Sequence, residues 1–294
     1  SWRRYSYDNF TGIRIMGVFQ NNLLAGAAAA ATAGGGGFYS HQIEQSARFD
    51  RADDSRLTRT FGTASSLKKF TISFWLKRAQ LGAAISGDTY AFMSIMNKTT
   101  GNYDGNAAAI IFDSGSHVDK FGLYRLPAGS STLRSDNLFR DTGGWNHLVV
   151  RADTTQSTAS DRLLMYLNGN QLTTNTPTAG YLSQDADYST FATADVHYIG
   201  TNASASGMGF DGYLAEFIFT DGQSYAPTQF GETKNGVWIP KNPSGTTFGN
   251  NGFHLKFENA SDLGNDSSGN NNDFSVTNMG ADHQSIDTPT LGTG

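Results

Sequence analysis

The sequence contains no cysteine, and this absence removes several classes of protein at once. Without thiols the chain has no disulfide scaffold, no thiolate metal site and no cysteine nucleophile. Glutamate is also scarce, with only Glu44, Glu216, Glu232 and Glu258 in the whole chain. Charged residues make up 16% of the sequence, whereas long exposed helices are rich in Glu and Lys. The composition therefore disfavours a helical protein.

Positive charge is not clustered either. The formal net charge is −5, and no run of Lys or Arg is longer than the pairs Arg3-Arg4 and Lys68-Lys69. Because nucleic-acid surfaces need concentrated positive charge, we expect no nucleic-acid partner.

The N-terminal part lacks a long apolar run. Residues 16–37 pass from a short apolar stretch into an Ala run and a Gly run, and Gln20, Asn21 and Asn22 interrupt the apolar part. We therefore expect no membrane span. Residues 1–40 are predicted to be an arm and Ala/Gly-rich linker, which is either flexible or docks on a neighbouring subunit.

Glycine and aromatic residues are abundant. The 34 glycines, together with many Asn, Asp, Ser and Thr residues, indicate numerous turns between short strands. Aromatic residues make up 12% and hydrophobic residues 38% of the chain, which is enough to fill a sizeable core. The composition favours one large all-β domain or two small domains.

The clearest local pattern lies between residues 145 and 174. Residues 145–153 and 162–168 alternate apolar and polar side chains, which predicts two strands joined by a polar loop. Asn168-Gly169 supplies the positive-φ dipeptide of a tight hairpin, so residues 171–174 are expected to form the returning strand. Three consecutive antiparallel strands follow from this one stretch.

Other segments extend the β pattern. Residues 69–78 place Phe70, Ile72, Phe74 and Leu76 on one face of a strand. Residues 212–220 are almost continuously apolar, as in the interior of a sandwich. Further strands are expected at 91–97, 107–113, 121–126, 132–138, 196–200, 252–258 and 274–276, and one short helix at 226–230. These elements predict two antiparallel sheets packed face to face.

Four stretches stand in an order that is typical of one family. They are ARFDRADDSRLTRTF, FTISFWLKR, GWNHLVVRAD with LLMYLNGNQL, and HYIGTN with FDGYLAEFIFTDG. This set resembles the laminin G-like branch of the concanavalin A-like lectin/glucanase superfamily, over roughly Ser46 to Gln223. The resemblance implies a two-sheet antiparallel β-sandwich, the concanavalin A-like jelly roll, preceded by an extended N-terminal arm.

A later segment resembles the family's first strand and its DSSGN loop, although it stands near the C-terminus. It reads FHLKFENASDLGNDSSGNNNDFSV. Either this segment completes a sheet of the same sandwich, since domain termini often lie close together, or it is a second, truncated copy. We assign residues 1–40 to the arm, 41–276 to the sandwich with 252–276 completing a sheet, and 277–294 to a C-terminal tail.

The combination of an MGVFQNNLLAGAA-type arm, this sandwich and a DSSGNNNDF…DTPT tail resembles proteins of bacterial viruses. The resemblance implies a virion structural or surface protein, such as a fibre, spike or decoration subunit, exposed on the extracellular particle. Its partners would be further copies of itself, other virion proteins and a host surface glycan.

Catalysis by a carboxylate pair finds little support. The glucanases of this superfamily carry Glu-x-Asp-x-(x)-Glu on one strand, since retaining hydrolysis needs two carboxyls about 5 Å apart. Glu216 stands alone, and its odd separation from Asp211 would place the two on opposite faces of a strand. The scattered histidines show no zinc spacing, and His147 is expected to be a core or hairpin residue. We predict that the protein is not an enzyme and assign no catalytic residue.

Two kinds of ligand remain as hypotheses, each against the simpler reading that these residues only form turns or cover the end of the sandwich. Calcium is the one cofactor considered, with oxygen ligands in two loops. The candidates are Asn102, Asp104, Asn106, Asp262, Asp266 and Asp273. Carbohydrate needs exposed aromatic rings beside polar groups. The candidates are Tyr103, Asp104, Tyr181, Asp185, Asp187 and Tyr188.

The sequence therefore favours a non-enzymatic, lectin-like virion protein that mediates assembly and glycan attachment. Two alternatives stay open. One is a glycan-processing hydrolase with an atypical acid pair, and the other is a capsid-stabilising subunit without a ligand.

Overall fold

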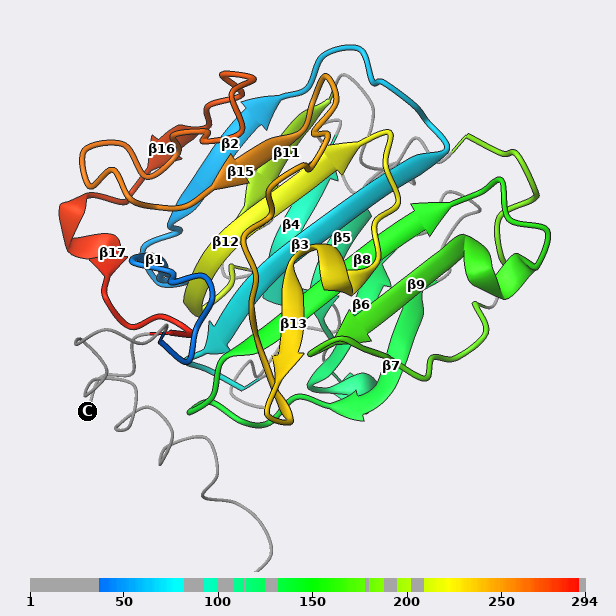
Figure 1. Ribbon diagram of the computed structural model, residues 1–294, viewed down its shortest axis with the longest axis horizontal. Coiled ribbons are helices and arrows are strands. Elements are labelled where there is room, and N and C mark those ends of the chain that lie inside the picture. Colours follow the sequence, from blue (N-terminus) through cyan, green and yellow to red (C-terminus); the bar gives the residue numbers. More distant parts are fainter. Residues whose placement is uncertain are drawn as a thin grey trace, which may run out of the picture.

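Two antiparallel sheets packed face to face form the body of the protein (Figure 1). The computed structural model describes residues 37–81, 93–99, 108–113, 115–124, 132–177, 180–187, 195–201 and 209–290. Between the sheets lies one large cluster of buried side chains in which phenylalanine predominates. The predicted all-β sandwich is confirmed.

The first sheet has the order β10-β9-β8-β3-β12-β1-β17, and β15 also pairs with β12. Its strands are β1 (Ser46–Phe49), β3 (Lys69–Arg78), β8 (Asn146–Asp153), β9 (Leu163–Leu167), β10 (Asn170–Gln171), β12 (Gly212–Asp221), β15 (Phe253–Leu255) and β17 (Gln284–Ser285).

The second sheet has the order β16-β2-β11-β4-β5-β6-β7, and Figure 1 shows β4, β5 and β6 behind the first sheet. Its strands are β2 (Arg56–Thr60), β4 (Met93–Thr99), β5 (Ala108–Phe112), β6 (Lys120–Tyr124), β7 (Leu133–Leu138), β11 (Val196–Ile199) and β16 (Ser275–Thr277). Short 3-10 turns occur at η2 (Gly115–His117), η3 (Ala159–Arg162), η5 (Pro227–Gln229) and η6 (Ala281–His283). The predicted short helix at 226–230 is thus a single 3-10 turn.

Strand β3 shows how the sequence pattern builds the core. Its alternate residues Phe70, Ile72, Phe74 and Leu76 all lie in the cluster between the sheets, as predicted. Each is at most 1% exposed, and burying such a side chain contributes about 1.5–3 kcal/mol. The ring of Phe74 stacks on Phe217 of β12 at 5.0 Å between centroids, so neighbouring strands share one packed layer.

The predicted hairpin is also confirmed. Asn168 and Gly169 between β9 and β10 have φ angles of 47° and 80°, which the twist of a two-residue hairpin requires. A second hairpin, β13 (Gly231–Lys234) with β14 (Val237–Pro240), turns at Asn235 and Gly236 with φ angles of 52° and 82°. The same Asn-Gly dipeptide therefore makes both turns.

Two strands from opposite ends of the chain share one edge of β12. Strand β1 pairs with residues 212–214, and β15 pairs with residues 217–219. In the second sheet, β16 pairs with β2. The C-terminal segment thus completes both sheets of one sandwich.

The chain remains packed beyond residue 276. Strand β17 pairs with β1, and Thr288 and Thr290 are buried. The amide of Ile43 donates to Oγ1 of Thr290 at 2.9 Å, and the same hydroxyl donates to the carbonyl of Ile43 at 3.1 Å. These bonds join the two ends of the described chain, and they fall in the residues that the sequence analysis assigned to the tail.

A third layer covers the outer face of the first sheet. The β13–β14 hairpin lies in front of β3 and β8 in Figure 1, and residues 37–45 run beside it. On this face Trp75 is 5% exposed and packs with Ile43, Ala215, Trp145 and Trp238. The outward residues of β3 are therefore buried as well, which the alternation of β3 did not predict.

Candidate functional site

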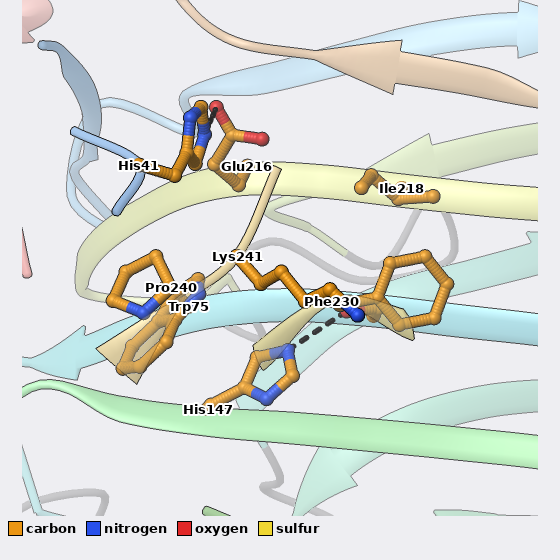
Figure 2. Close-up of a pocket in the computed structure, with 9 residues that line it drawn as sticks. His41, Trp75, His147, Glu216, Ile218, Phe230, Pro240 and Lys241 are labelled. Atoms are coloured by element: carbon orange, nitrogen blue, oxygen red, sulfur yellow. Dashed lines mark hydrogen bonds and ion pairs between the residues drawn. The ribbon is translucent and has the colours of Figure 1, made fainter. Parts of the chain in front are cut away.

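The first sheet carries two candidate sites, a small cavity and an open groove. The cavity lies beneath the β13–β14 hairpin (Figure 2). Here His147 of β8 sits between Ser73 of β3 and Trp238 of β14. The indole Nε1 of Trp238 donates to Nδ1 of His147 at 3.0 Å, and Nε2 of His147 lies 2.9 Å from Oγ of Ser73. His147 is 1% exposed, and burial lowers its pKa to about 3.

These contacts decide which way the protons point. An indole nitrogen can only donate, so Nδ1 of the neutral imidazole accepts and Nε2 carries the proton. Nε2 therefore donates to Ser73, and it has no lone pair with which to take a proton from the hydroxyl. His147 cannot activate Ser73 as a nucleophile in this arrangement, and the predicted core role of His147 is confirmed.

Glu216 forms a second polar group in the same layer. A β-bulge interrupts the pairing of β12 with β3 between Ala215 and Ile218, and Glu216 has a φ of 47°. The bulge falls between the part of β12 paired with β1 and the part paired with β15. The side chain of Glu216 is thereby turned toward His254 of β15 and His41 of the N-terminal segment.

The charge of Glu216 is held by these histidines. Burial by itself raises the pKa of this carboxyl, but the charge and hydrogen bond of His254, together with the nearby His41, lower the pKa to about 2. Nε2 of His254 is in direct hydrogen-bond contact with Oε2, and Nε2 of His41 lies 3.6 Å from Oε1. Glu216 is thus an ionised carboxylate engaged by two protein groups.

The space beside these groups is small. The cavity has a volume of about 10 Å³, which is about the room that one water needs. In the view of Figure 2, the lining residues Pro240, Lys241 and Phe230 lie between His147 and the pair Glu216 and His41. A sugar does not fit there.

The second place is an open groove at the edge of the first sheet, between β9 and the segment that leaves β10. Its volume is about 340 Å³, within the range of small-molecule sites. It is lined by Ser160, Leu163, Leu164, Met165, Gln171, Leu172, Thr173, Thr174 and Tyr181. We call it the Tyr181 groove.

The floor and the rim of the Tyr181 groove differ in chemistry. Leu163, Met165 and Leu172 are buried parts of the main core and form an apolar floor. Gln171 and Thr173 on the rim are exposed, and Tyr181 is half-buried. This combination of an aromatic ring, an apolar floor and neutral polar groups suits a ligand that is apolar on one face and hydroxylated at its edges.

Hydrogen bonds fix the wall that carries Tyr181. The buried guanidinium of Arg162 donates to the carbonyl of Leu182 at 2.6 Å and to the carbonyls of Gln156 and Ser157, both at 2.9 Å. Further along, Oγ1 of Thr154 donates to the carbonyl of Ala186 at 2.7 Å. The segment that follows Tyr181 is thus tied to the sandwich at Leu182 and again at Ala186.

The comparisons with known proteins decide the family. A laminin G family model, described as concanavalin A-like lectin/glucanases superfamily, matches residues 51–223. The chain belongs to this superfamily. No curated protein matches it in sequence.

Several solved structures are similar to this chain at low identity. A heptameric SAP-like pentraxin from Limulus polyphemus is 12% identical, with 65% of this chain and 82% of that chain covered and a TM-score of 0.43. A putative carbohydrate binding protein from Bacteroides ovatus is 14% identical, with 81% and 61% covered and a TM-score of 0.48. Domains LG4-5 of the mouse laminin alpha1 chain are 10% identical, with 63% and 44% covered and a TM-score of 0.41. The chain spans less than two thirds of the last two.

The glucanase members of the superfamily use paired carboxylates, whereas the partners of Glu216 among the described residues are the histidines His254 and His41. The bulge removes the strict alternation on which the expected opposite faces of Asp211 and Glu216 rested. The two carboxyls nevertheless have different neighbours. Burial and Asp50 raise the pKa of Asp211, while Arg48 and Arg51 lower it. The groups that shift the pKa of Glu216 are both histidines.

Of the other carbohydrate candidates, Asp185 and Asp187 are described, and neither lines the Tyr181 groove. Asp185 is exposed, and its Oδ1 lies 3.3 Å from Nζ of Lys68. Asp187 is exposed and does not line the groove. Tyr103, Asp104 and Tyr188 lie outside the described residues.

The predicted calcium ligands of the second loop are engaged with the protein itself. Oδ1 of Asp266 accepts the amides of His254 and Ser268, both at 2.8 Å, and Oδ2 accepts the Ser268 hydroxyl and the Asn272 amide. Asp273 accepts the amide of Asp266 at 2.7 Å, and Asp262 accepts that of Gly264 at 3.1 Å.

Within the described residues, no three His, Asp or Glu side chains gather in a way that could hold an ion. Asn102, Asp104 and Asn106 lie outside this part of the chain. Among the helices described, none has the length and apolar character to cross a membrane.

Sequence reasoning missed most of the groove. Gln171 and Thr173 were assigned to a returning strand and Leu163 and Met165 to an alternating one. The available signal was the short β10 followed by polar residues, which indicates that the chain leaves the sheet edge there.

Proposed function

We propose that this protein is a non-enzymatic, carbohydrate-binding β-sandwich whose ligand lies in the Tyr181 groove. One observation carries the proposal: the groove combines an open volume of about 340 Å³ with an aromatic wall, an apolar floor and a neutral polar rim. Sugars present apolar C–H faces and hydroxyl edges, and such a groove can contact both.

The state of the ionisable groups supports a binding role over hydrolysis. A retaining hydrolase needs a nucleophile and an acid about 5 Å apart with room for the sugar between them. Glu216 is bound by two histidines and faces a space for about one water. His147 is neutral and directs its proton toward Ser73.

We further place this module on the surface of a virion, as a fibre, spike or decoration subunit. The support is the resemblance of the arm, the sandwich and the DSSGNNNDF…DTPT segment, in that order, to proteins of bacterial viruses. Host surface glycan is then the proposed ligand, and other virion proteins and further copies of the chain are the proposed partners. In an oligomer, weak single-site contacts add up to useful avidity.

A glycan array tests the binding function. The wild-type protein is expected to bind a subset of glycans, and Tyr181→Ala is expected to lose that binding. Tyr198→Ala is the matched control, because Tyr198 is a similarly half-buried tyrosine on β11 of the other sheet. An array that stays blank for the wild-type protein, with stable particles, would favour the capsid-stabilising role instead.

A hydrolysis assay tests the absence of catalysis. Incubation with host polysaccharide is expected to release no reducing sugar. Release by the wild-type protein that disappears in Glu216→Gln would show that the protein is an enzyme.

Light scattering on the full chain and on a chain that lacks residues 1–37 tests the proposed arm. We expect the oligomer to be lost on deletion. An unchanged oligomeric state would contradict an assembly role of the arm.

A further inference from the structure

The charge of the Tyr181 groove points to the class of its ligand. Each of its nine lining residues is uncharged: Ser160, Leu163, Leu164, Met165, Gln171, Leu172, Thr173, Thr174 and Tyr181. We propose that the groove selects neutral saccharides and discriminates against sialylated, sulfated and uronic-acid sugars. This inference rests on the proposed function and names the substrate class of the same site.

The nearest cation in sequence is already engaged. Arg162 precedes the lining residue Leu163, yet its guanidinium is buried and donates to the carbonyls of Gln156, Ser157 and Leu182. An acidic sugar needs a charge-assisted partner to offset the cost of removing its carboxylate from water. Each guanidinium nitrogen of the buried Arg162 donates to a backbone carbonyl, so this side chain fixes the wall of the groove and is not exposed to an anion in it.

Lys68, which lies beside the segment that follows Tyr181, has an acidic partner as well. Lys68 Nζ lies 3.3 Å from Oδ1 of Asp185, on the segment that follows Tyr181. Asp187 and Asp161 are exposed neighbours in sequence of the groove's walls, and they add negative charge to this end of the protein. Free carboxylates outside the groove disfavour an anionic ligand through repulsion.

The rim offers neutral hydrogen-bonding groups. The side chains of Gln171 and Thr173 form no hydrogen bond to another described residue, so an amide and a hydroxyl are left to meet sugar hydroxyls. An amide can donate and accept at once, which matches a hydroxyl that does both. A buried apolar floor then contacts the C–H face of the sugar ring.

Isothermal titration with matched neutral and acidic oligosaccharides tests the inference. The neutral set contains glucose, galactose, mannose and N-acetylglucosamine chains, and the acidic set contains sialylated, sulfated and uronic-acid chains. We expect binding to a neutral member, with affinity that changes less than about twofold between about 0.05 M and about 0.5 M salt, because no ion pair is screened. Tyr181→Ala is expected to weaken this binding about tenfold or more.

Two substitutions of opposite charge at Thr173, on the rim, distinguish a neutral from an acidic ligand. Thr173 is exposed, so Thr173→Lys and Thr173→Glu are expected to fold with unchanged melting temperatures. For a neutral ligand the two variants should weaken binding to a similar extent. Gln171→Ala, with the exposed Gln184→Ala as its control, should also weaken binding. If Tyr181→Ala fails to fold, the Thr173 and Gln171 variants still test whether the ligand binds in this groove.

Each result has a distinct meaning. Binding of acidic glycans alone, strengthened by Thr173→Lys and weakened by salt, would overturn the neutral class while leaving a carbohydrate-binding function in place. Neutral binding that ignores Tyr181, Gln171 and Thr173 would overturn the assignment to this groove. Binding to no glycan in either set would overturn the proposed function itself.

Discussion

Trp238 donates a hydrogen bond from its indole Nε1 to Nδ1 of His147 at 3.0 Å, and this contact joins the β13–β14 hairpin to the central sheet. The two rings are also nearly parallel, with 5.9 Å between their centroids. One contact thus fixes both the docking of the third layer and the proton position of a buried imidazole.

Trp238→Phe should remove the donor while keeping much of the ring packing. Nδ1 of His147 is then a buried acceptor without its partner, which typically costs about 1–3 kcal/mol. Urea unfolding should show this loss. Nitrogen NMR should find the proton of His147 on Nε2 in the wild-type protein. A wild-type proton on Nδ1 would contradict the arrangement.

The stability of the protein should fall between pH 7 and pH 5 because of His147. The folded pKa of about 3 is below the ordinary value of 6.5, so the unfolded chain binds the proton more readily in this range. The contribution is fully present above pH 6.5 and is lost as the pH falls toward 3. The expected loss from pH 7 to pH 5 is about 2 kcal/mol.

His147→Gln should flatten this pH dependence in urea unfolding. His117→Gln, a substitution at an exposed histidine, is the control. Equal slopes for wild type and His147→Gln would contradict the neutral, buried state of His147.

Glu216→Gln should destabilise the protein at pH 7 by about 3 kcal/mol, because it removes a buried carboxylate from its two histidines. The folded pKa of Glu216, about 2, lies below the ordinary 4.5. Its stabilising contribution is therefore present above pH 4.5 and is lost as the pH falls toward 2. The difference between wild type and variant should shrink over this range.

Glu258→Gln provides the comparison for Glu216→Gln. The side chain of Glu258 is 51% exposed and lies 3.6 Å from Lys256, so its loss should change stability by less than about 1 kcal/mol. A difference for Glu216→Gln that stays constant down to pH 2 would contradict the lowered pKa of Glu216.

Chelation should leave the melting temperature unchanged, because the oxygens of Asp266 already accept protein N–H and O–H groups. Asp266→Ala should instead cost about 2–4 kcal/mol through the donors that it leaves unpaired. Thermal unfolding with EDTA and with added calcium measures both effects. A rise in melting temperature with calcium that Asp266→Ala abolishes would restore this loop as a calcium site.

Gly169→Ala and Gly236→Ala should differ although both glycines have positive φ angles, 80° and 82°. A Cβ at Gly169 would lie 2.4 Å from Cζ3 of Trp238, whereas a Cβ at Gly236 would meet nothing within 4 Å. Gly236→Ala should cost about 1 kcal/mol from the backbone alone, and Gly169→Ala clearly more. Equal melting temperatures would show that Trp238 does not press on the β9–β10 turn.

Some features of the fold could be predicted from the sequence because they depend on local residue preferences. The Asn168-Gly169 turn followed from two residues that tolerate positive φ, and the core face of β3 followed from strict alternation over Phe70 to Leu76. The all-β class followed from scarce Glu, abundant Gly and short alternating runs. Tyr181 was chosen as an aromatic residue in a polar loop, and it lines the groove.

What the sequence by itself determined is therefore the all-β class, the longer strands such as β3, β8 and β12, and the Asn168-Gly169 turn, because these depend on neighbours a few residues apart. Only the tertiary structure decided that β15 joins β12, that the β13–β14 hairpin buries Trp75 and His147, and that Gln171 and Thr173 meet Tyr181 at one groove. Each of these depends on contacts between distant segments. The bulge at Glu216 and the early end of β10 at Gln171 leave no mark in the alternation of apolar and polar residues.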